Sequence, residues 1–275
     1  MNGVRIQDIA RRWDLTAEAW DERMGENGDW FSRYLLYPAI LKLVGDTAGK
    51  RVLDAGCGTG CLSRALARKG AIVIGIDVSA RLIAKAYRYE EETLLGISYV
   101  QGDLANMPLQ SLVFDHIICN MVIQDLPNPQ AVLCSFAPML SGDGKLLISL
   151  RHPCFTVGDS DMGWELVTSE GNVIFSGLGL SHLESWRGLQ GIVFKLDNYF
   201  QRAIISREWA PGVVTISFKR TLQDYIEAMH NAGFVIKRIL EPMPMEEGIS
   251  QSPCLSMLLQ RVPNFMIIEA VLMPT

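Results

Sequence analysis

The chain has 275 residues, of which 49% are hydrophobic and 20% are charged, and its formal net charge is −5. This balance is typical of a globular protein rather than a disordered one. The length allows one large domain or one domain with a sizeable insertion. A large nucleic-acid surface needs clustered lysine and arginine. The acidic excess argues against one, so we expect no nucleic-acid partner.

The amino-terminal residues mix charged and apolar side chains and contain no signal-peptide core. No apolar run approaches the roughly 18 residues of a membrane span, so we expect no membrane partner. The six cysteines form neither a Cys-x-x-Cys pair nor a spacing typical of metal ligands. The sequence therefore predicts a reduced, cytoplasmic protein without a metal site.

Residues 1–48 are predicted to form a helical lid. Apolar side chains recur at helical spacing over residues 5–24 and again over residues 30–44. Gly28 lies between the two stretches and interrupts them.

From residue 49 to residue 152 the pattern alternates between strand and helix, which predicts a ligand-binding core. The strands are apolar nearly throughout, which indicates a parallel sheet covered on both faces. Ser79 is placed to cap one of the helices. The predicted strands are "RVLDAG", "AIVIGID", "ISYVQGD", "VFDHIICN" and "GKLLISL", and the predicted helices cover 61–70, 80–92 and 129–140.

The alternation stops after residue 152, and residues 153–214 read as an inserted strand-rich cap with strands such as "GNVIFSG", "GIVFKL" and "VVTISF". Residues 215–275 return to a helix, "LQDYIEAMHNAGF", and two strands, "FVIKRIL" and "NFMIIEAVLM", which complete the core. The predicted fold class is therefore α/β: a Rossmann-like, seven-stranded, mostly parallel sheet with helices on both faces and an inserted cap.

Four polar residues lie at or just after the ends of predicted strands: Asp54, Asp77, Asp103 and Asn120. Ligands of open α/β sheets bind at the carboxyl ends of the strands, near the point where strand order reverses. We therefore expect these side chains to share one rim and to contact one ligand.

The loop after the first strand has glycine at positions 56, 58 and 60. Such a loop lets the backbone approach a ligand and opens onto a helix amino terminus, whose N–H groups favour anions. The carboxylate of Asp54 at the same loop would repel the negative charge of a pyrophosphate. A dinucleotide fingerprint would also need glycine where the chain has Cys61. The ligand is therefore expected to carry both positive and negative charge.

The pattern D-x-G-x-G-x-G from Asp54 to Gly60 resembles motif I of the class I S-adenosylmethionine-dependent methyltransferases. Further segments resemble this family in the same order, over roughly residues 50–155. A weaker resemblance extends to "AGFVIKRILEP" and the last strand. These segments are "VIGIDVS", "QGDLANMP", "FDHIICNMVIQDLPNP" and "LLISLRHPCF".

The resemblance implies S-adenosylmethionine as cofactor and S-adenosylhomocysteine as product. It places Asp54 near the methionine ammonium, Asp77 at the ribose hydroxyls and Asp103 at the adenine amino group. Taken alone, Asp77 could instead start a helix, and Asp103 could instead cap a turn. Trp13 and Trp20 could help the lid fold over the cofactor. The implied cofactor-binding set is Asp54, Gly56, Cys57, Gly58, Gly60, Asp77, Val78, Asp103, Leu104 and Asn120.

The implied reaction is in-line transfer of a methyl group to a small molecule, with oxygen or nitrogen favoured as the acceptor atom and carbon left open. The signature of nucleobase amino-methyltransferases, N/D-P-P-Y/F, is absent, because the chain has "NMVIQ" there. His152 follows the fifth strand and is the candidate general base; the alternative is that it orders the turn before Pro153. Two other functions stay open, a nicotinamide-dependent oxidoreductase and a non-catalytic S-adenosylmethionine-binding protein, as does the oligomeric state.

Overall fold

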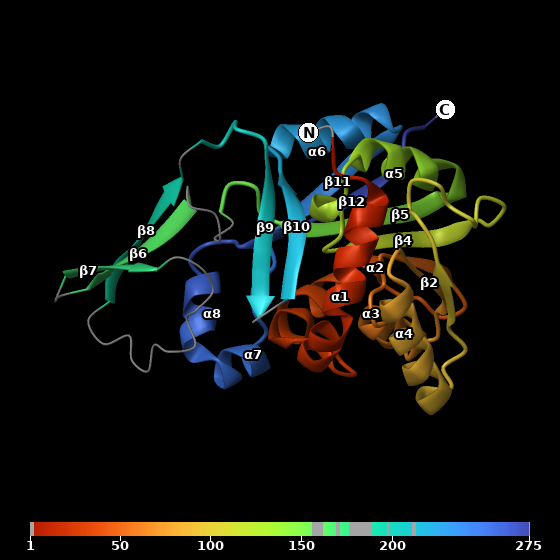
Figure 1. Ribbon diagram of the computed structural model, residues 1–275, viewed down its shortest axis with the longest axis horizontal. Coiled ribbons are helices and arrows are strands. Elements are labelled where there is room, and N and C mark those ends of the chain that lie inside the picture. The colour runs from red at the N-terminus through yellow and green to blue at the C-terminus, as the bar shows by residue number, and fades with distance from the viewer. Residues whose placement is uncertain are drawn as a thin grey trace.

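The computed structural model describes residues 3–155, 162–168, 171–175, 189–196, 198–210 and 213–274. Its centre is a seven-stranded sheet with the strand order β11-β12-β5-β4-β1-β2-β3 (Figure 1). The strands of this sheet are β1 (Arg51–Ala55), β2 (Ile72–Asp77), β3 (Ser98–Gln101), β4 (Phe114–Asn120), β5 (Leu140–Arg151), β11 (Phe234–Leu240) and β12 (Phe265–Leu272).

Five strands of the sheet, β1 to β5, run parallel to one another, whereas β12 is antiparallel to both β5 and β11. The predicted fold class is therefore confirmed. Strand order reverses between β1 and β4, because the chain passes from β1 to β2 and β3 and then returns to the other side of β1. This is the point at which ligands of such sheets bind.

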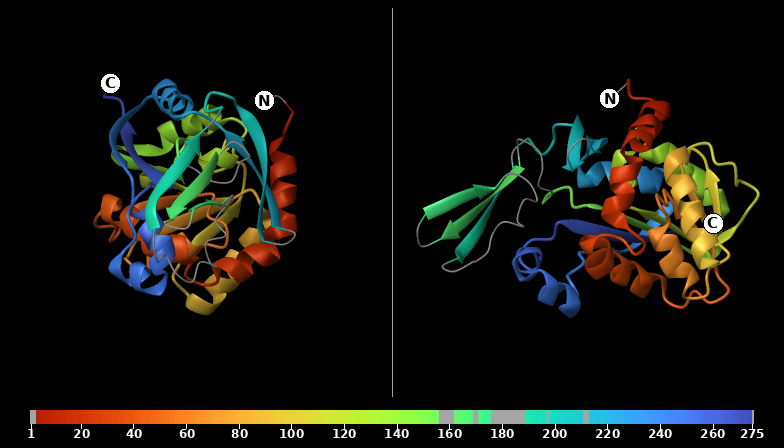
Figure 2. Two further views of the ribbon diagram at one scale, coloured as in Figure 1. Left: turned by 90° about the vertical axis from the view of Figure 1, so that its left-hand side faces the viewer. Right: turned by 60° about the horizontal axis from the view of Figure 1, so that its bottom comes forward.

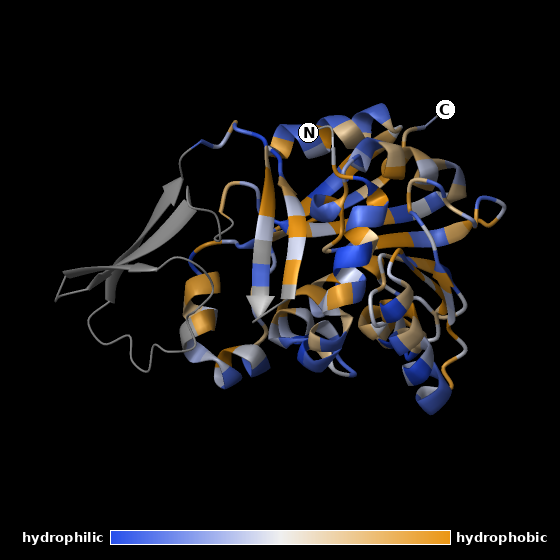
Figure 3. Ribbon diagram, viewed as in Figure 1, coloured by the Kyte–Doolittle hydropathy of each residue, from blue (hydrophilic) through white to orange (hydrophobic). Residues whose placement is uncertain are grey.

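Both faces of the sheet are buried, which explains the nearly continuous apolar runs of the strands. In β5, Leu146, Ile148 and Leu150 pack into the core on one face, while Leu147 packs into the core on the other. Figure 3 shows the strands as mostly hydrophobic. Adjacent residues of one strand thus stabilise two different helical layers.

Helices α2, α3 and α4 contribute to the core on one face of the sheet, and α5 and α6 to the core on the other. Ser79 caps α4 as predicted, since its hydroxyl accepts a hydrogen bond from the N–H of Leu82 at 3.1 Å. The bounds are α2 (Tyr37–Val44), α3 (Cys61–Ala67), α4 (Ala80–Thr93), α5 (Pro129–Phe136) and α6 (Leu222–Asn231), with short 3₁₀ turns η2 (Ile123–Asp125) and η3 (Ala137–Met139).

The amino-terminal segment forms α1 (Ile6–Met24), as predicted, and then departs from a simple helix. Between residues 30 and 44 the chain makes a π-helical turn, η1 (Ser32–Leu36), before α2 begins. Pro38 has no N–H, so the carbonyl of Tyr34 lacks its α-helical donor. The N–H of Met245 donates to that carbonyl at 2.9 Å instead. A contact from the far end of the chain therefore satisfies the interrupted helix.

The predicted cap region contains two small antiparallel sheets. One is formed by β6 (Met162–Thr168), β7 (Gly171–Phe175) and β8 (Leu189–Leu196), and the other by β9 (Ala203–Ala210) and β10 (Val213–Lys219). Strands β6 and β9 were not predicted. The hairpin of β9 and β10 lies beside α1 (Figure 2). The predicted boundary between residues 214 and 215 falls inside β10, and the division into four regions stays a prediction.

Two short helices, α7 (Glu246–Gln251) and α8 (Pro253–Leu259), lie between the last two strands of the sheet and were not predicted. Gly248 in α7 approaches η1 closely, because a Cβ at this position would lie 2.5 Å from the Cβ of Tyr34. Among the helices described, none combines the length and the apolar character that crossing a bilayer requires.

Candidate functional site

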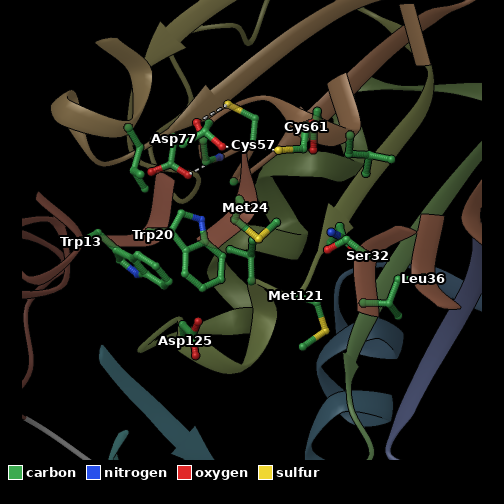
Figure 4. Close-up of a pocket in the computed structure, with 18 of the residues that line it drawn as sticks. Trp13, Trp20, Met24, Ser32, Leu36, Cys57, Cys61, Asp77, Met121 and Asp125 are labelled. Carbon is green, nitrogen blue, oxygen red and sulfur yellow. Dashed lines mark hydrogen bonds between the residues drawn. The ribbon is translucent and has the colours of Figure 1, made fainter. Parts of the chain in front are cut away.

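A cavity of about 180 Å³ lies between the rim of the sheet and α1 (Figure 4). The ends of β1, β2 and β4 contribute Asp54, Asp77 and Asn120 to its lining. These strands are neighbours, with Asp54 level with Gly75 of β2 and Ile118 of β4. The structure therefore brings three of the four predicted rim residues to one cavity.

The glycine loop, residues 56–60, forms part of the cavity wall, and its glycines have different roles. Gly56 and Gly60 have φ angles of +80°, and a Cβ would lie 2.3 Å from Val122 at the first and 2.3 Å from Tyr99 at the second. Gly58 faces a more open space, because the nearest atom to its Cβ position is Nε1 of Trp20 at 3.7 Å. Gly56 and Gly58 line the cavity, whereas Gly60 lies outside its lining and starts α3.

Asp77 joins the glycine loop to the start of α4. Its Oδ2 accepts a hydrogen bond from the N–H of Gly58 at 2.9 Å, and its Oδ1 accepts one from the N–H of Ser79 at 2.9 Å. The side chain is buried, and burial raises the pKa of its carboxyl although both hydrogen bonds oppose the rise. Each oxygen retains a lone pair for a donor on a ligand.

Asp54 is almost fully buried and accepts a 2.6 Å hydrogen bond from the hydroxyl of Ser63. Burial, with a further contribution from Asp77, raises the pKa of Asp54 to about 6. Neither Asp54 nor Asp77 forms an ion pair with any residue that the structure describes. Arg64 is buried nearby, but its guanidinium donates to the carbonyls of Glu26 and Thr59. The cavity thus holds two buried acids that a ligand cation would stabilise.

The remaining members of the predicted cofactor set divide between the cavity and its surroundings. Val78, Leu104 and Cys57 line the cavity. Asp103 is not among the lining residues: its Oδ1 accepts from the N–H of Ala105 at 3.0 Å and its Oδ2 accepts from Asn106 at 2.9 Å. These contacts fit the alternative in which Asp103 caps a turn, and its contact with adenine stays a prediction.

A hydrogen-bonded chain runs from Asn120 into the loop that follows β4. The hydroxyl of Ser149 donates to Oδ1 of Asn120 at 2.6 Å and accepts from the N–H of Met121 at 3.0 Å. Met121 has a left-handed backbone, with φ of 60°, which is uncommon for a residue with a side chain. Its carbonyl accepts a hydrogen bond from Nε2 of Gln124. This chain fixes the position of Gln124, which also lines the cavity.

His152 does not reach the cavity: it is buried, and its place in the fold is at the exit from β5. Its Nδ1 accepts a hydrogen bond from the N–H of Cys154 at 3.2 Å, and its Nε2 lies 3.2 Å from Oε1 of Glu241. Burial lowers the pKa of the imidazole despite the opposing effect of Glu241. These contacts fit the alternative in which His152 orders the turn before Pro153. Its role as a base stays a prediction.

Helix α1 covers the cavity and places Trp13 and Trp20 in the lining. The two indoles meet edge to face, with ring centroids 5.2 Å apart, and Figure 4 shows both on the side of the pocket near Asp77. This position fits the predicted lid. No described residue between 153 and 214 contributes to the lining.

The contact between α1 and α4 is polar. Lys85 of α4 lies 2.7 Å from Glu18 and 3.2 Å from Asp21, both in α1. Asp14 of α1 accepts a 2.6 Å hydrogen bond from Ser79, the residue that caps α4 and binds Asp77. The lid is therefore linked directly to the rim.

Several lining residues were missed by sequence reasoning. Gln124 and Asp125 follow β4 in the segment "NMVIQDLPNP", whose position on the rim was predicted without a role for either residue. Arg151, Asn264 and Phe265 come from the end of β5 and the start of β12. Arg151 and Phe265 are paired across these antiparallel strands, and only the strand order of the folded sheet reveals that they share the site.

Comparison with known proteins gives consistent results. The family model of the methyltransferase domain matches residues 53–148. Two curated relatives, ubiquinone biosynthesis O-methyltransferases from Glaesserella parasuis and Coxiella burnetii, are each 34% identical over 158 and 146 residues, which is 54% and 52% of this chain. The matches cover 65% and 61% of the relatives' own lengths, less than two thirds in both cases.

Among solved structures, an S-adenosylmethionine-dependent methyltransferase from Mesorhizobium loti aligns with a TM-score of 0.67 at 23% identity. The alignment covers 90% of this chain and 100% of the other. At this identity the likeness shows a shared fold.

Proposed function

Because the chain belongs to the class I S-adenosylmethionine-dependent methyltransferase superfamily, we propose that it transfers a methyl group from S-adenosylmethionine to a small-molecule acceptor. The acceptor atom is an oxygen or a nitrogen. The observation that carries the proposal is the pair of buried acids, Asp54 and Asp77, beside a glycine loop that is open at Gly58.

The two carboxylates, which are hydrogen-bond acceptors, and the glycine loop fit S-adenosylmethionine. The ligand carries an ammonium and ribose hydroxyls, both of which donate hydrogen bonds, and a carboxylate. Asp54 would hold the ammonium, which lowers the free energy of its ionised form. Asp77 would accept from the ribose hydroxyls with the lone pairs that Gly58 and Ser79 leave unused. Val78 and Leu104 supply apolar contacts for the adenine.

When bound, the cofactor supplies a methyl group on a positively charged sulfur, which is a good leaving group. The protein then has to align the acceptor with that methyl and exclude water. Trp13 and Trp20 on α1 cover the cavity and exclude solvent from it. A hydroxyl acceptor must also lose a proton, and His152 is the sequence-based candidate to remove it.

Incubation of the purified protein with methyl-labelled S-adenosylmethionine and a panel of phenols, carboxylic acids and amines tests the proposal. We expect label in an organic product and stoichiometric formation of S-adenosylhomocysteine. Tight cofactor binding with no transfer to any member of a broad panel would instead support the non-catalytic binding function. The curated relatives act in ubiquinone biosynthesis by O-methylation, as their names state, so phenols are the first acceptors to test.

A further inference from the structure

Two buried carboxamide oxygens on residues that line the cavity accept no hydrogen bond from the residues that the structure describes. They are Oε1 of Gln124 and Oδ1 of Asn264, and these two residues are 6% and 5% exposed. Both residues line the cavity. Nearly all buried polar groups in native proteins have a hydrogen-bond partner, and one without a partner costs free energy. A ligand donor at each oxygen would remove that cost.

Both residues lie on the side of the cavity away from Asp77. Asn264 directly precedes β12, which is separated from β2 by β5, β4 and β1. Because neighbouring strands are about 4.8 Å apart, β12 and β2 are roughly 19 Å apart across the rim. Gln124 lies in η2, which contacts β5 and β10. The two carboxamides therefore border the part of the cavity that the proposed cofactor site leaves for the acceptor.

The oxygen and nitrogen of the Gln124 carboxamide cannot exchange places without loss. Its Nε2 donates to the carbonyl of Met121, and the N–H of Met121 is held by the hydroxyl of Ser149. Exchanging the oxygen and nitrogen of the carboxamide would set its oxygen against that carbonyl. The contact therefore directs a nitrogen toward Met121 and leaves the oxygen as an acceptor.

Asn264 is fixed through its backbone. Its carbonyl accepts a hydrogen bond from the N–H of His152 at 2.9 Å, which joins the exit from β5 to the start of β12. Its Oδ1 has no hydrogen-bond partner among the residues that the structure describes. Its neighbour Phe265 contributes an apolar surface to the same cavity.

We propose that Gln124 and Asn264 bind the methyl acceptor by accepting hydrogen bonds from two donors on it. The inference rests on the proposed function and adds the acceptor's chemistry. Phe31, Leu36 and Phe265 line the cavity with apolar surface, so the acceptor is a compact, largely apolar molecule with two O–H or N–H groups. Ethers and carbonyls at the same positions would leave the carboxamide oxygens unsatisfied.

Arg151 also lines the cavity. An acceptor could therefore be recognised through a carboxylate that pairs with this guanidinium, instead of through hydrogen-bond donors. Nη2 of Arg151 donates to the hydroxyl of Ser217 in β10 at 2.9 Å. That nitrogen of the guanidinium therefore joins the hairpin to the end of β5, and an anionic acceptor is the outcome against which the two-donor acceptor has to be tested.

Three probes of closely similar shape test the inference: resorcinol, 3-methoxyphenol and 1,3-dimethoxybenzene, which carry two, one and no donors. Binding of each is measured by calorimetry and ligand-observed NMR to protein saturated with S-adenosylhomocysteine. We expect affinity to fall by about tenfold for each donor lost, because the oxygen is then left buried without a partner. Apolar area rises along the series, so hydrophobic burial alone would produce the opposite order.

Asn264→Leu should reduce the preference for resorcinol over 3-methoxyphenol to about twofold or less and leave the affinity for S-adenosylhomocysteine unchanged. Asn231→Leu, which removes an exposed carboxamide at the end of α6, is the matched control and should preserve the preference. Without ligand, Asn264→Leu should keep or raise Tm, since an unsatisfied buried group is replaced by an apolar one of similar size.

Equal affinity for the three probes, or binding of none by protein that binds S-adenosylhomocysteine, would overturn the inference. A fall of several degrees in the Tm of Asn264→Leu would also count against it, by showing that the oxygen already has a partner. If S-adenosylhomocysteine itself does not bind, the proposed function is wrong, and this inference with it.

Discussion

At the glycine-loop side of the cavity, both oxygens of Asp77 accept backbone hydrogen bonds and Asp54 accepts one from Ser63. At the side formed by η2 and β12, the side-chain oxygens of Gln124 and Asn264 accept none from any residue that the structure describes. The first side is assembled by the chain itself and lacks only a cation. The second side is completed only by a ligand. The glycine-loop side therefore has its geometry set by the protein's own hydrogen bonds, and we call it the preset side. The polar groups of the other side find hydrogen-bond partners only when the acceptor binds.

Asp77→Ala is expected to have the largest effect on the preset side. Two charge-assisted hydrogen bonds to the ligand, each worth about 1.5–3 kcal/mol, would be lost, so the Kd for S-adenosylhomocysteine should rise by roughly 10²–10⁴-fold. Titration calorimetry measures the change. Asp103→Ala is the matched control, because Asp103 binds Ala105 and Asn106 outside the cavity lining.

The control has its own informative outcome. A change of less than about threefold in Asp103→Ala is expected if this carboxylate only caps its turn. A loss of tenfold or more, the size of one charge-assisted hydrogen bond, would restore the predicted contact with the adenine amino group. Equal losses of affinity for S-adenosylhomocysteine in Asp77→Ala and Asp103→Ala would contradict the proposal that Asp77 is the main ligand-binding acid of the two.

Asp54 should make ligand-free stability and ligand affinity depend on pH in opposite directions. Its folded pKa is about 6, against a usual value of 3.8. Between these values the folded protein retains a proton that the unfolded chain has released, so stability falls as pH rises from 4 to 6, by at most about 1.4 kcal/mol per unit. The ligand ammonium favours the ionised carboxylate, so affinity rises over the same range, by at most about tenfold per unit.

Melting curves and titrations between pH 4 and pH 7 measure both effects in the wild type and in Asp54→Asn. The variant keeps the size of the side chain and removes the titration. We expect a shallower pH dependence of both quantities in the variant. Identical slopes in the two proteins would show that other groups, among them Asp77, account for the dependence.

His152→Ala tests a residue that the structure places outside this comparison. Because His152 contacts Cys154 and Glu241 rather than the cavity, we expect a lower Tm and a fall in kcat of less than about tenfold. A general base typically contributes about 10²- to 10⁴-fold. A fall of that size for a hydroxyl acceptor, with unchanged Tm and cofactor affinity, would establish His152 as the base.

The smallest effect is expected at the contact between the lid and α4. Lys85→Met keeps the aliphatic stem and removes the charge that faces Glu18 and Asp21. Partly exposed ion pairs contribute about 0–1 kcal/mol, so S-adenosylhomocysteine should dissociate only a few-fold faster. High salt should have a similar effect on the wild type and almost none on the variant. Stopped-flow tryptophan fluorescence follows the rate through Trp13 and Trp20.

The preset side of the cavity could be predicted from sequence because its chemistry is local. The glycine loop and the acids at the ends of β1 and β2 are visible as residue types at fixed positions after apolar runs. Asp77 lies only two residues from Ser79, its partner. Such short-range arrangements depend little on the rest of the fold.

The other side could not be predicted, because its properties arise from distant parts of the chain. Asn264 reaches the cavity only because β12 pairs with β5 in the sheet. That its side-chain oxygen lacks a hydrogen-bond partner is evident only when its neighbours in the fold are known. Likewise, the donor to the Tyr34 carbonyl in the π-helical turn before α2 comes from the distant residue Met245. His152 was predicted from its place after β5, but the direction of its ring depends on Cys154 and Glu241.

Titration calorimetry of the wild-type protein with S-adenosylhomocysteine, with NAD⁺ as the matched dinucleotide, decides between the methyltransferase and the oxidoreductase. We expect saturable binding of S-adenosylhomocysteine at one site per chain, weakened by Asp77→Ala, and no saturable binding of NAD⁺. Saturable binding of NAD⁺ by folded protein that fails to bind S-adenosylhomocysteine would contradict the proposed methyltransferase function and support the oxidoreductase.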